Sequence, residues 1–153
     1  REGRSLRIYK VRTMVADSDN VERYLSEKQL EQWRRERKVD DDPRIVSVGR
    51  ILRKTSLDEL PQFLNVLAGQ MSVIGPRPIT KDELVWFGEE AALVLSVPPG
   101  ITGWWQVSSR NSATFESGER QALELYYARN ANLCLDAKIF LLTFRSILGG
   151  TGQ

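Results

Sequence analysis

The chain has 153 residues, and 41% of them are hydrophobic, so it can build one compact domain around a core of its own. Its formal net charge of +2 is too small to indicate a nucleic-acid partner. The absence of histidine excludes Ser-His-Asp and Cys-His triads and histidine-ligated zinc, and the single cysteine excludes an internal disulfide. Acid–base or covalent chemistry therefore falls to carboxylates, lysines, tyrosines or that cysteine.

The N-terminal part of the chain predicts a strand followed by a helix. Residues 6–14 alternate apolar and basic side chains, which is typical of a strand with Leu6, Ile8 and Val11 as core contacts. Residues 17–38 predict a helix whose basic end is a solvated face. The three aspartates that follow it predict a solvated loop rather than a metal site, because successive side chains point in different directions.

Two adjacent carboxylates, Asp58 and Glu59, precede an apolar helical run and have two competing explanations. Ser56 and Glu59 have the spacing of a capping box, and Asp58 would add favourable charge at the positive end of the helix dipole. The helix then continues through residues 60–67 and can end at Gly69. On the residues alone, the capping explanation is the simpler one and a catalytic pair is the alternative.

Prolines mark a turn after this helix. Residues 75–78 read Gly-Pro-Arg-Pro, which predicts a rigid turn that holds Arg77 in one place. Thr80 and Glu83 repeat the capping-box spacing, so we expect a second helix over residues 83–97.

The C-terminal part predicts a hairpin and two helices. Residues 98–111 have the glycines of a hairpin-like element, in which residues 104–107 would form a strand with one of its two tryptophans in the core. The two helical stretches are residues 115–130 and 132–148. The second is apolar but carries three charges, which is typical of an amphipathic helix on the core or at a membrane interface.

Five basic residues lie beside glycines, prolines or the ends of predicted elements, where loops position functional groups. They are Lys10, Arg12, Arg53, Arg77 and Arg110. Arginine suits phosphate, because its guanidinium binds two oxygens at once. If the five converge on Asp58 and Glu59, the site has a carboxylate nucleophile, a second acid for a metal ion and cationic groups for a diphosphate.

Five motifs in this order resemble those of the bacterial sugar transferase family, the monotopic polyprenol-phosphate phosphoglycosyl transferases. They are YKVRTM, DPRI, VGRILRKTSLDELPQFLNVLAGQMSVIGPRP, PGITGWWQVSSRN and LDAKI. The resemblance implies that Asp58 and Glu59 are catalytic. In this interpretation Asp58 attacks the β-phosphate of a UDP-sugar and expels UMP, and polyprenol phosphate then takes the sugar phosphate from the aspartyl intermediate.

The resemblance also implies a cofactor and a substrate-binding set. Mg²⁺ is expected, with Glu59 as its ligand. Arg53 and Arg77 match basic family positions near the site, and Lys10, Arg12 and Arg110 complete the predicted substrate-binding residues.

The fold implied by the resemblance is α+β: a mainly helical single domain around a short β-hairpin, with amphipathic membrane-interface helices. Residues 1–153 would form the cytosolic catalytic domain, and the re-entrant N-terminal membrane helix usual in the family is absent from this sequence. The implied partners are a UDP-sugar, polyprenol (undecaprenyl) phosphate and the cytoplasmic face of the bacterial inner membrane. The implied process is the start of capsule, exopolysaccharide or O-antigen synthesis, with a hexose as the first expectation for the sugar.

A hypothesis from another class is a non-catalytic membrane-surface module, in which capped helices, an exposed tryptophan and a basic helix bind anionic headgroups. It predicts that neutralising Asp58 leaves function untouched, whereas the enzyme interpretation predicts near-total loss.

Overall fold

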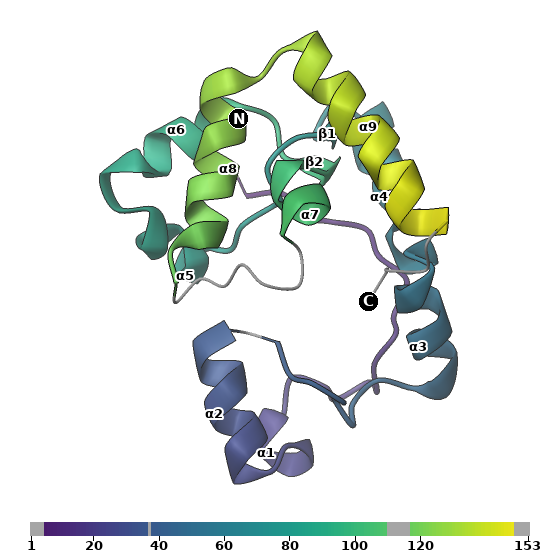
Figure 1. Cartoon of the computed structure of the whole chain (residues 1–153). Coiled ribbons are helices and arrows are strands. Elements are labelled where there is room, and N and C mark those ends of the chain that lie inside the picture. The colour runs from purple at the N-terminus through teal and green to yellow at the C-terminus, as the bar shows by residue number, and fades with distance from the viewer. Residues whose placement is uncertain (1–4, 37, 110–116, 149–153) are drawn as a thin grey trace.

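The structure is a computed structural model that describes residues 5–36, 38–109 and 117–148. Helices dominate it, as Figure 1 shows. In chain order they are α1 (Val21–Tyr24), α2 (Glu27–Glu36), α3 (Ser47–Lys54), the 3-10 helix η1 (Leu57–Glu59), α4 (Gln62–Leu67), α5 (Lys81–Leu84), the 3-10 helix η2 (Val85–Glu90), α6 (Ala91–Ser96), α7 (Trp104–Ser108), α8 (Glu119–Asn130) and α9 (Leu133–Leu148). The strands are β1 (Ser72–Ile74) and β2 (Gly100–Thr102). The predicted mainly helical α+β class is confirmed.

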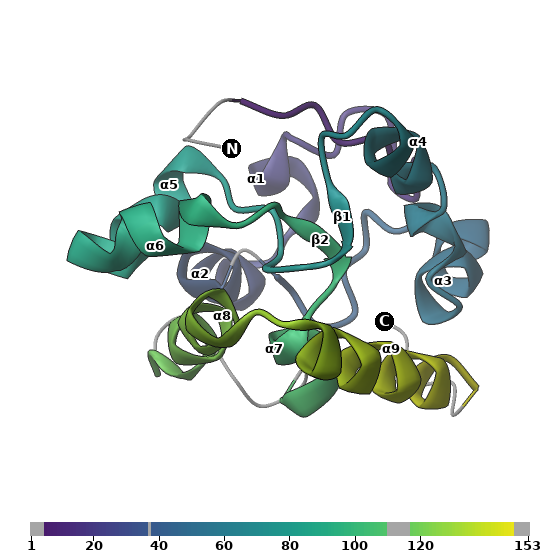
Figure 2. The same ribbon diagram turned by 90° about the horizontal axis from the view of Figure 1, so that it is seen from above.

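The two strands are parallel, so the predicted β-hairpin is wrong. Ser72 pairs with Gly100 and Ile74 with Thr102. Parallel neighbours require a crossover connection, and here α5, η2 and α6 provide it. Figure 2 shows the strand pair near the centre, with α7, α8 and α9 together on one side of it.

The segment predicted as the second hairpin strand is the helix α7. Its tryptophans pack on neighbouring helices, and this packing overrides their preference for strands. Trp105 is buried against the Arg120 guanidinium of α8, while Trp104 is half-buried between Tyr126 and Lys138. The expectation of one core tryptophan is therefore confirmed, although the element is helical.

The predicted N-terminal strand is an extended segment without a partner strand. Its backbone hydrogen bonds go to η1 and α4 instead: Val11 N donates to Asp58 O, and Tyr9 N donates to Asn65 Oδ1. Only Met14 forms a bridge, to Ile45, among the described residues. Ile8 and Val11 are exposed, so the prediction that they are core contacts is wrong.

The predicted helix over residues 17–38 is divided into α1 and α2 within the part of it that the structure describes. Ser26 begins the second helix, because its Oγ accepts from Gln29 N while Gln29 Oε1 accepts from Ser26 N. This is a capping-box arrangement, and the Ser-x-x-Gln spacing signals it in the sequence. The predicted capping box of Thr80 and Glu83 is confirmed at the start of α5.

Helix α4 buries its polar side and exposes its apolar side. Asn65 is fully buried and Gln62 is 6% exposed. Apolar side chains of the helix and the turn before it face outward, among them Leu60, Leu64 and Leu67. A solvent-exposed apolar side of this kind marks an interaction surface rather than a core helix.

The core lies between the crossover helices and α8. Phe87, Val94 and Leu125 form its buried centre, and partly buried side chains around them include Leu84 and Leu93. Within the described ranges, no helix is both long and apolar enough to cross a bilayer.

The aspartate run contains a buried ion pair, so the prediction of a wholly solvated loop is wrong. Arg44 donates from Nη2 to Asp42 Oδ2 at 2.6 Å and from Nε to Asp42 Oδ1 at 2.9 Å. Both side chains are under 8% exposed. Burial alone would raise the pKa of Asp42, but the hydrogen bonds from Arg44 outweigh it and hold that pKa below its ordinary value.

Candidate active site

The two adjacent carboxylates share one cation. Lys10 Nζ lies 3.1 Å from Asp58 Oδ2 and 3.2 Å from Glu59 Oε1. The Asp58 side chain is 3% exposed, whereas the side chains of Glu59 and Lys10 are 30% and 43% exposed. Asp58 is thus a buried carboxylate beneath an accessible ammonium group, and Glu59 extends from the pair toward solvent.

The structure removes the capping box from the explanation of these acids, which both lie in the first turn of η1. Ser56 has a left-handed backbone with φ of 56°, and its side chain makes no capping hydrogen bond. The Glu59 carboxylate pairs with Lys10 rather than reaching back to Ser56. The predicted capping box at Ser56 is therefore wrong, because α3 ends at Lys54 and the chain must turn sharply before η1.

Asn65 fixes the extended segment that carries Lys10. Its Nδ2 donates to Arg7 O at 2.9 Å and to Gln70 Oε1 at 2.8 Å, while its Oδ1 accepts from Tyr9 N at 3.1 Å. These bonds use both N–H donors of the buried amide and one acceptor site of its oxygen. They place Lys10 one residue beyond a fixed backbone position, above the carboxylate pair.

Of the other predicted substrate-binding residues, Arg53 belongs to the helix that precedes this pair in the chain. It extends from α3, which packs on η1, and its Nε donates to the buried Thr13 Oγ1 at 2.8 Å. Arg12 is exposed and forms no hydrogen bond or ion pair with the described residues. Arg110 lies outside the described residues.

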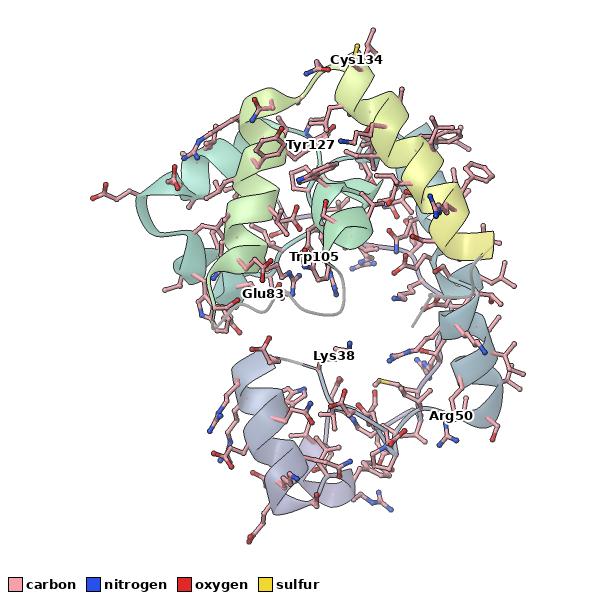
Figure 3. All side chains as sticks on the ribbon, in the orientation of Figure 1. Lys38, Arg50, Glu83, Trp105, Tyr127 and Cys134 are labelled. Carbon is pink, nitrogen blue, oxygen red and sulfur yellow. The ribbon has the colours of Figure 1, made fainter. Side chains whose placement is uncertain are left out.

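Arg77 belongs to a second cluster, around Trp105. Its guanidinium carbon lies 5.9 Å from the centroid of the Trp105 ring, and that of Arg120 lies 4.1 Å from the same centroid. Figure 3 shows Trp105 below α7, with Glu83 near the lower end of α8. No hydrogen bond or ion pair between described residues joins this cluster to Asp58 or Glu59.

Glu124 of α8 is the buried acid of the second cluster, with an exposed fraction of 1%. Burial raises its pKa to about 7, against the opposing effects of the Arg77 N–H and of the Arg120 and Arg77 charges. Burial also lowers the pKa of Arg120 to about 10, and the neighbouring Arg77 charge acts in the same direction. Both shifts show that the Arg120 guanidinium and the Glu124 carboxylate are held away from water.

We expect Glu124→Gln to change how stability depends on pH. The folded pKa of Glu124, about 7, exceeds its ordinary 4.5, so its contribution to stability is complete below pH 4.5 and is lost as the pH rises through 7. Glutamine cannot ionise, so the variant should gain up to about 3 kcal/mol in unfolding free energy relative to wild type across this range. Urea denaturation at several pH values measures the difference.

The matched control is Glu119→Gln, an exposed position on the same helix. Because the position is exposed, this substitution should change the unfolding free energy by less than about 1 kcal/mol. Parallel curves for wild type and Glu124→Gln would contradict the raised pKa.

Asp58 and Glu59 could serve a metal ion only together with other ligands. Among the described residues no group of three or more His, Cys, Asp or Glu side chains gathers as a metal site. Mg²⁺ nevertheless binds proteins through one or two carboxylates, with waters and substrate phosphates completing its shell. The half-buried carboxylate of Glu59 fits that donor set, and no dedicated protein cage is required.

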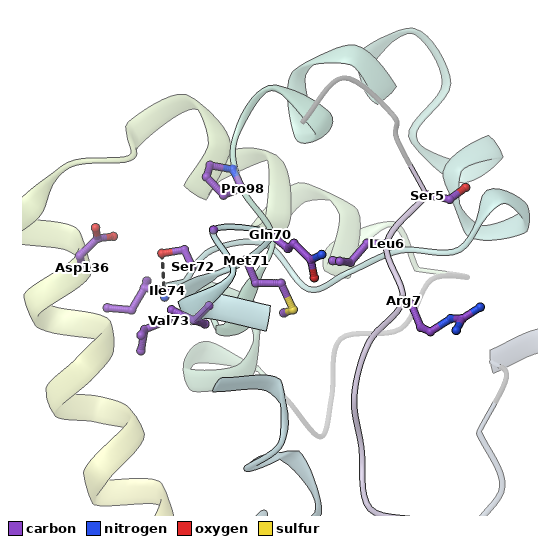
Figure 4. A pocket seen from close by; sticks show the side chains of 12 residues that line it. Ser5, Leu6, Arg7, Gln70, Met71, Ser72, Val73, Ile74, Pro98 and Asp136 are labelled. Atoms are coloured by element: carbon purple, nitrogen blue, oxygen red, sulfur yellow. Dashed lines mark hydrogen bonds between the residues drawn. The ribbon is translucent and has the colours of Figure 1, made fainter. Parts of the chain in front are cut away.

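A surface hollow of about 1000 Å³ lies beside β1, and no residue of either cluster lines it. Figure 4 shows that Leu6, Met71, Ile74 and Asp136 are among the residues that line it. Neither Asp58 nor Arg77 does. The Asp58 and Glu59 carboxylates therefore do not line this hollow.

Comparison with known proteins gives one consistent match. The family described as "Bacterial sugar transferase" matches residues 1–150. The exopolysaccharide production protein ExoY of Sinorhizobium fredii is 40% identical over 99% of this chain and 67% of its own length. The galactosyl transferase CpsE of Streptococcus agalactiae is 43% identical, and the undecaprenyl-phosphate galactose phosphotransferase of Salmonella typhimurium is 41% identical; each match covers 99% of this chain and about a third of the relative. The chain belongs to the bacterial sugar transferase family, and it is a sugar-phosphate transferase enzyme.

Proposed function

We propose that the protein transfers a sugar 1-phosphate from a UDP-sugar to polyprenol phosphate through Asp58. The Asp58 carboxylate attacks the β-phosphorus, the bond from that phosphorus to the bridging oxygen breaks, and UMP leaves with the electron pair. The phosphate oxygen of the lipid then attacks the same phosphorus and displaces Asp58. The products are UMP and a polyprenol diphosphate sugar, and the carboxylate is regenerated.

The buried Asp58 carboxylate beneath Lys10 carries this proposal. The Asp58 carboxylate lies against the accessible ammonium group of Lys10, and no capping box forms at the helix turn that carries it. A buried carboxylate with no structural task of that kind is the group expected of a nucleophile. Lys10 is exposed enough to turn from the carboxylates toward a phosphate oxygen, so it would both cover the nucleophile and receive the donor.

Neighbouring groups would supply the charge neutralisation that phosphoryl transfer needs. Arg53 sits one helix away, anchored on Thr13, and suits an oxygen of the diphosphate. Glu59 would hold Mg²⁺, which when bound shields the diphosphate from the approaching carboxylate. Arg12 and Arg110 stay predictions for substrate binding.

The names of similar proteins support the proposed donor and acceptor substrates. One similar protein is the UDP-galactose-lipid carrier transferase of Erwinia amylovora, which is 38% identical over 99% of this chain. Those names, with that of ExoY, favour a UDP-hexose donor, an undecaprenyl-phosphate acceptor and a role in exopolysaccharide synthesis. UDP-galactose is the donor we would test first.

An exposed apolar face supports a place at the membrane surface, which we propose is the cytoplasmic side of the inner membrane. The face consists of side chains from α3, η1 and α4, namely Val48, Ile51, Leu57, Leu60, Phe63, Leu64 and Leu67. Basic Arg50 and Lys54 are exposed on the same helix α3. Apolar side chains beside cations are what a helix lying on anionic lipid presents. Residues 1–153 would then be the catalytic domain, docked beside its lipid substrate.

The function is tested with the natural full-length protein in membranes that contain polyprenol phosphate and Mg²⁺. UMP release is measured across a panel of UDP-sugars, with UDP-galactose, UDP-glucose and UDP-N-acetylgalactosamine among them. We expect release with one donor class. Without acceptor, intact mass should increase by one sugar phosphate. No release with any donor would contradict the transferase proposal for this chain.

We expect Leu67→Glu to weaken binding to anionic vesicles by on the order of tenfold or more, because a carboxylate on the apolar face opposes burial in lipid and is repelled by the headgroups. Leu67 is 84% exposed on α4. Flotation of the chain with phosphatidylglycerol vesicles measures this. The control is Val85→Glu on η2, which is 76% exposed and lies outside the apolar face. Equal losses in both variants would count against this docking face.

A further inference from the structure

The buried acid Glu124 has no part in the chemistry proposed above, yet it contacts a predicted substrate-binding residue. Its two carboxylate oxygens lie 3.2 and 3.3 Å from the backbone N–H of Arg77. Placing an ionisable group at 1% exposure is costly unless it is paired and hydrogen-bonded. Such a placement against a backbone amide points to a specific task for the carboxylate.

The turn of residues 75–78, which contains Arg77, is also held from the side opposite Glu124. A Cβ on Gly75 would lie 2.4 Å from Pro98 O, and one on Gly103 would lie 2.1 Å from Gly75 O. Only glycine allows backbones to approach so closely. The turn is thus clamped between the end of β2 and the side of α8, and two prolines restrict its remaining freedom.

The clamped turn presents a guanidinium. Arg77 is exposed, while Arg120 on the same Trp105 ring is 7% exposed, so two cationic groups share one aromatic surface and one of them faces outward. Guanidinium groups fixed in this way suit a phosphate group, which accepts two hydrogen bonds from each fork.

We propose that Glu124 is a positioning residue: by accepting the Arg77 N–H, it fixes the turn so that the Arg77 guanidinium meets a phosphate group of the substrate. Glu124 itself does not touch the substrate. The identity of that phosphate rests on the proposed function, where it is either the diphosphate of the UDP-sugar or the phosphate of the lipid acceptor.

Four variants of the full-length protein in membranes test this: Glu124→Ala, Arg77→Ala, their combination and Glu124→Gln. We expect Glu124→Ala to raise the KM of one substrate by on the order of tenfold, the size of a lost charge-assisted hydrogen bond. The KM that rises, for UDP-sugar or for polyprenol phosphate, identifies the phosphate. In the Arg77→Ala background, adding Glu124→Ala should not raise this KM any further. If the KM increases of Glu124→Ala and Arg77→Ala multiplied in the double variant, the two residues would act independently, and the proposal would be overturned.

A pH series keeps the test valid if Glu124→Ala does not fold. Glutamine retains an acceptor of the same shape but never ionises. The charged groups facing Glu124 are Arg77, Arg120 on its own helix and Glu83 on α5, whereas α6 and α7 contribute none. We expect the ratio of wild-type to Glu124→Gln kcat/KM to rise severalfold from pH 6 to pH 8, as Glu124 ionises. A ratio near one throughout would overturn the proposal.

Direct binding separates this inference from the proposed function. Pyrophosphate is titrated calorimetrically into wild type, Glu124→Ala, Arg77→Ala and the control Glu119→Gln. If wild type releases no UMP but its pyrophosphate affinity depends on Glu124 and Arg77, the positioning role stands and the transferase proposal fails. If UMP is released but Glu124→Ala matches Glu119→Gln in both KM values and in affinity, the positioning role fails alone.

Discussion

Asp58→Asn is expected to reduce sugar-dependent UMP release by at least about 10³-fold, because an amide cannot attack phosphorus and the covalent route closes. The substitution conserves size in a buried site, and Lys10 keeps its contact with Glu59. UMP release in membranes, followed with the preferred donor, measures the loss. The phosphosugar adduct on the protein should disappear with it.

The matched control for this variant is Asp82→Asn, at an exposed position in the first turn of α5. It should retain wild-type release. If Asp58→Asn kept its activity, Asp58 would not be the nucleophile; if wild type were also silent while vesicle binding persisted, the non-catalytic membrane module would be the better account.

Arg44→Met is expected to lower the free energy of unfolding by about 3 kcal/mol, because it leaves the Asp42 carboxylate buried without its partner. The low exposure of both side chains makes this pair different from an ordinary surface ion pair. The loss should shrink as the pH falls below 3.8, the ordinary pKa of Asp42, because a protonated carboxyl no longer needs the cation. Urea denaturation of wild type and variant measures both effects.

Two further variants control for other causes. Arg23→Met breaks an exposed ion pair with Asp17, in which the Arg23 side chain is 66% exposed and that of Asp17 is 45% exposed. Its loss should lower the unfolding free energy by less than about 1 kcal/mol. The double variant Asp42→Asn, Arg44→Met should recover part of the loss, since no buried charge is left. A double variant no better than Arg44→Met would show that packing, rather than charge, explains the result.

Local signals in the sequence predicted local structure. The Thr80 and Glu83 capping box depends on residues three apart, and it forms as predicted. Ser56 and Glu59 have the same spacing and form no cap, because the preceding helix α3 forces a turn and Lys10 attracts the glutamate. Spacing alone cannot separate these two cases, since the deciding partner lies far along the chain.

Periodicity predicted elements but not which side of them is buried. Residues 6–14 are extended as their alternation suggests, but their hydrogen-bond partners are a 3-10 helix and an amide side chain rather than a strand. The apolar stripe around α4 predicts a helix and faces outward, because Asn65 is required inside to hold the N-terminal segment. The pair Asp58 and Glu59 was recognisable in the sequence, and motif resemblance favoured its catalytic interpretation, whereas the roles of Asn65 and Glu124 depend on tertiary contacts that no pattern of spacing reveals.

The tie between the N-terminal segment and Asn65 has a consequence for how the site assembles during folding. The Tyr9–Asn65 and Lys10–Glu59 contacts join residues 56 and 49 positions apart, whereas many core contacts among η2, α6 and α8 are closer in sequence. Contacts that close long loops form late, because their entropy loss precedes their energetic gain. A refolding chain should therefore regain its helical circular dichroism before Lys10 reaches the carboxylates. Recovery of catalysis would lag behind recovery of helix, and a chain caught between the two stages would be compact and inactive.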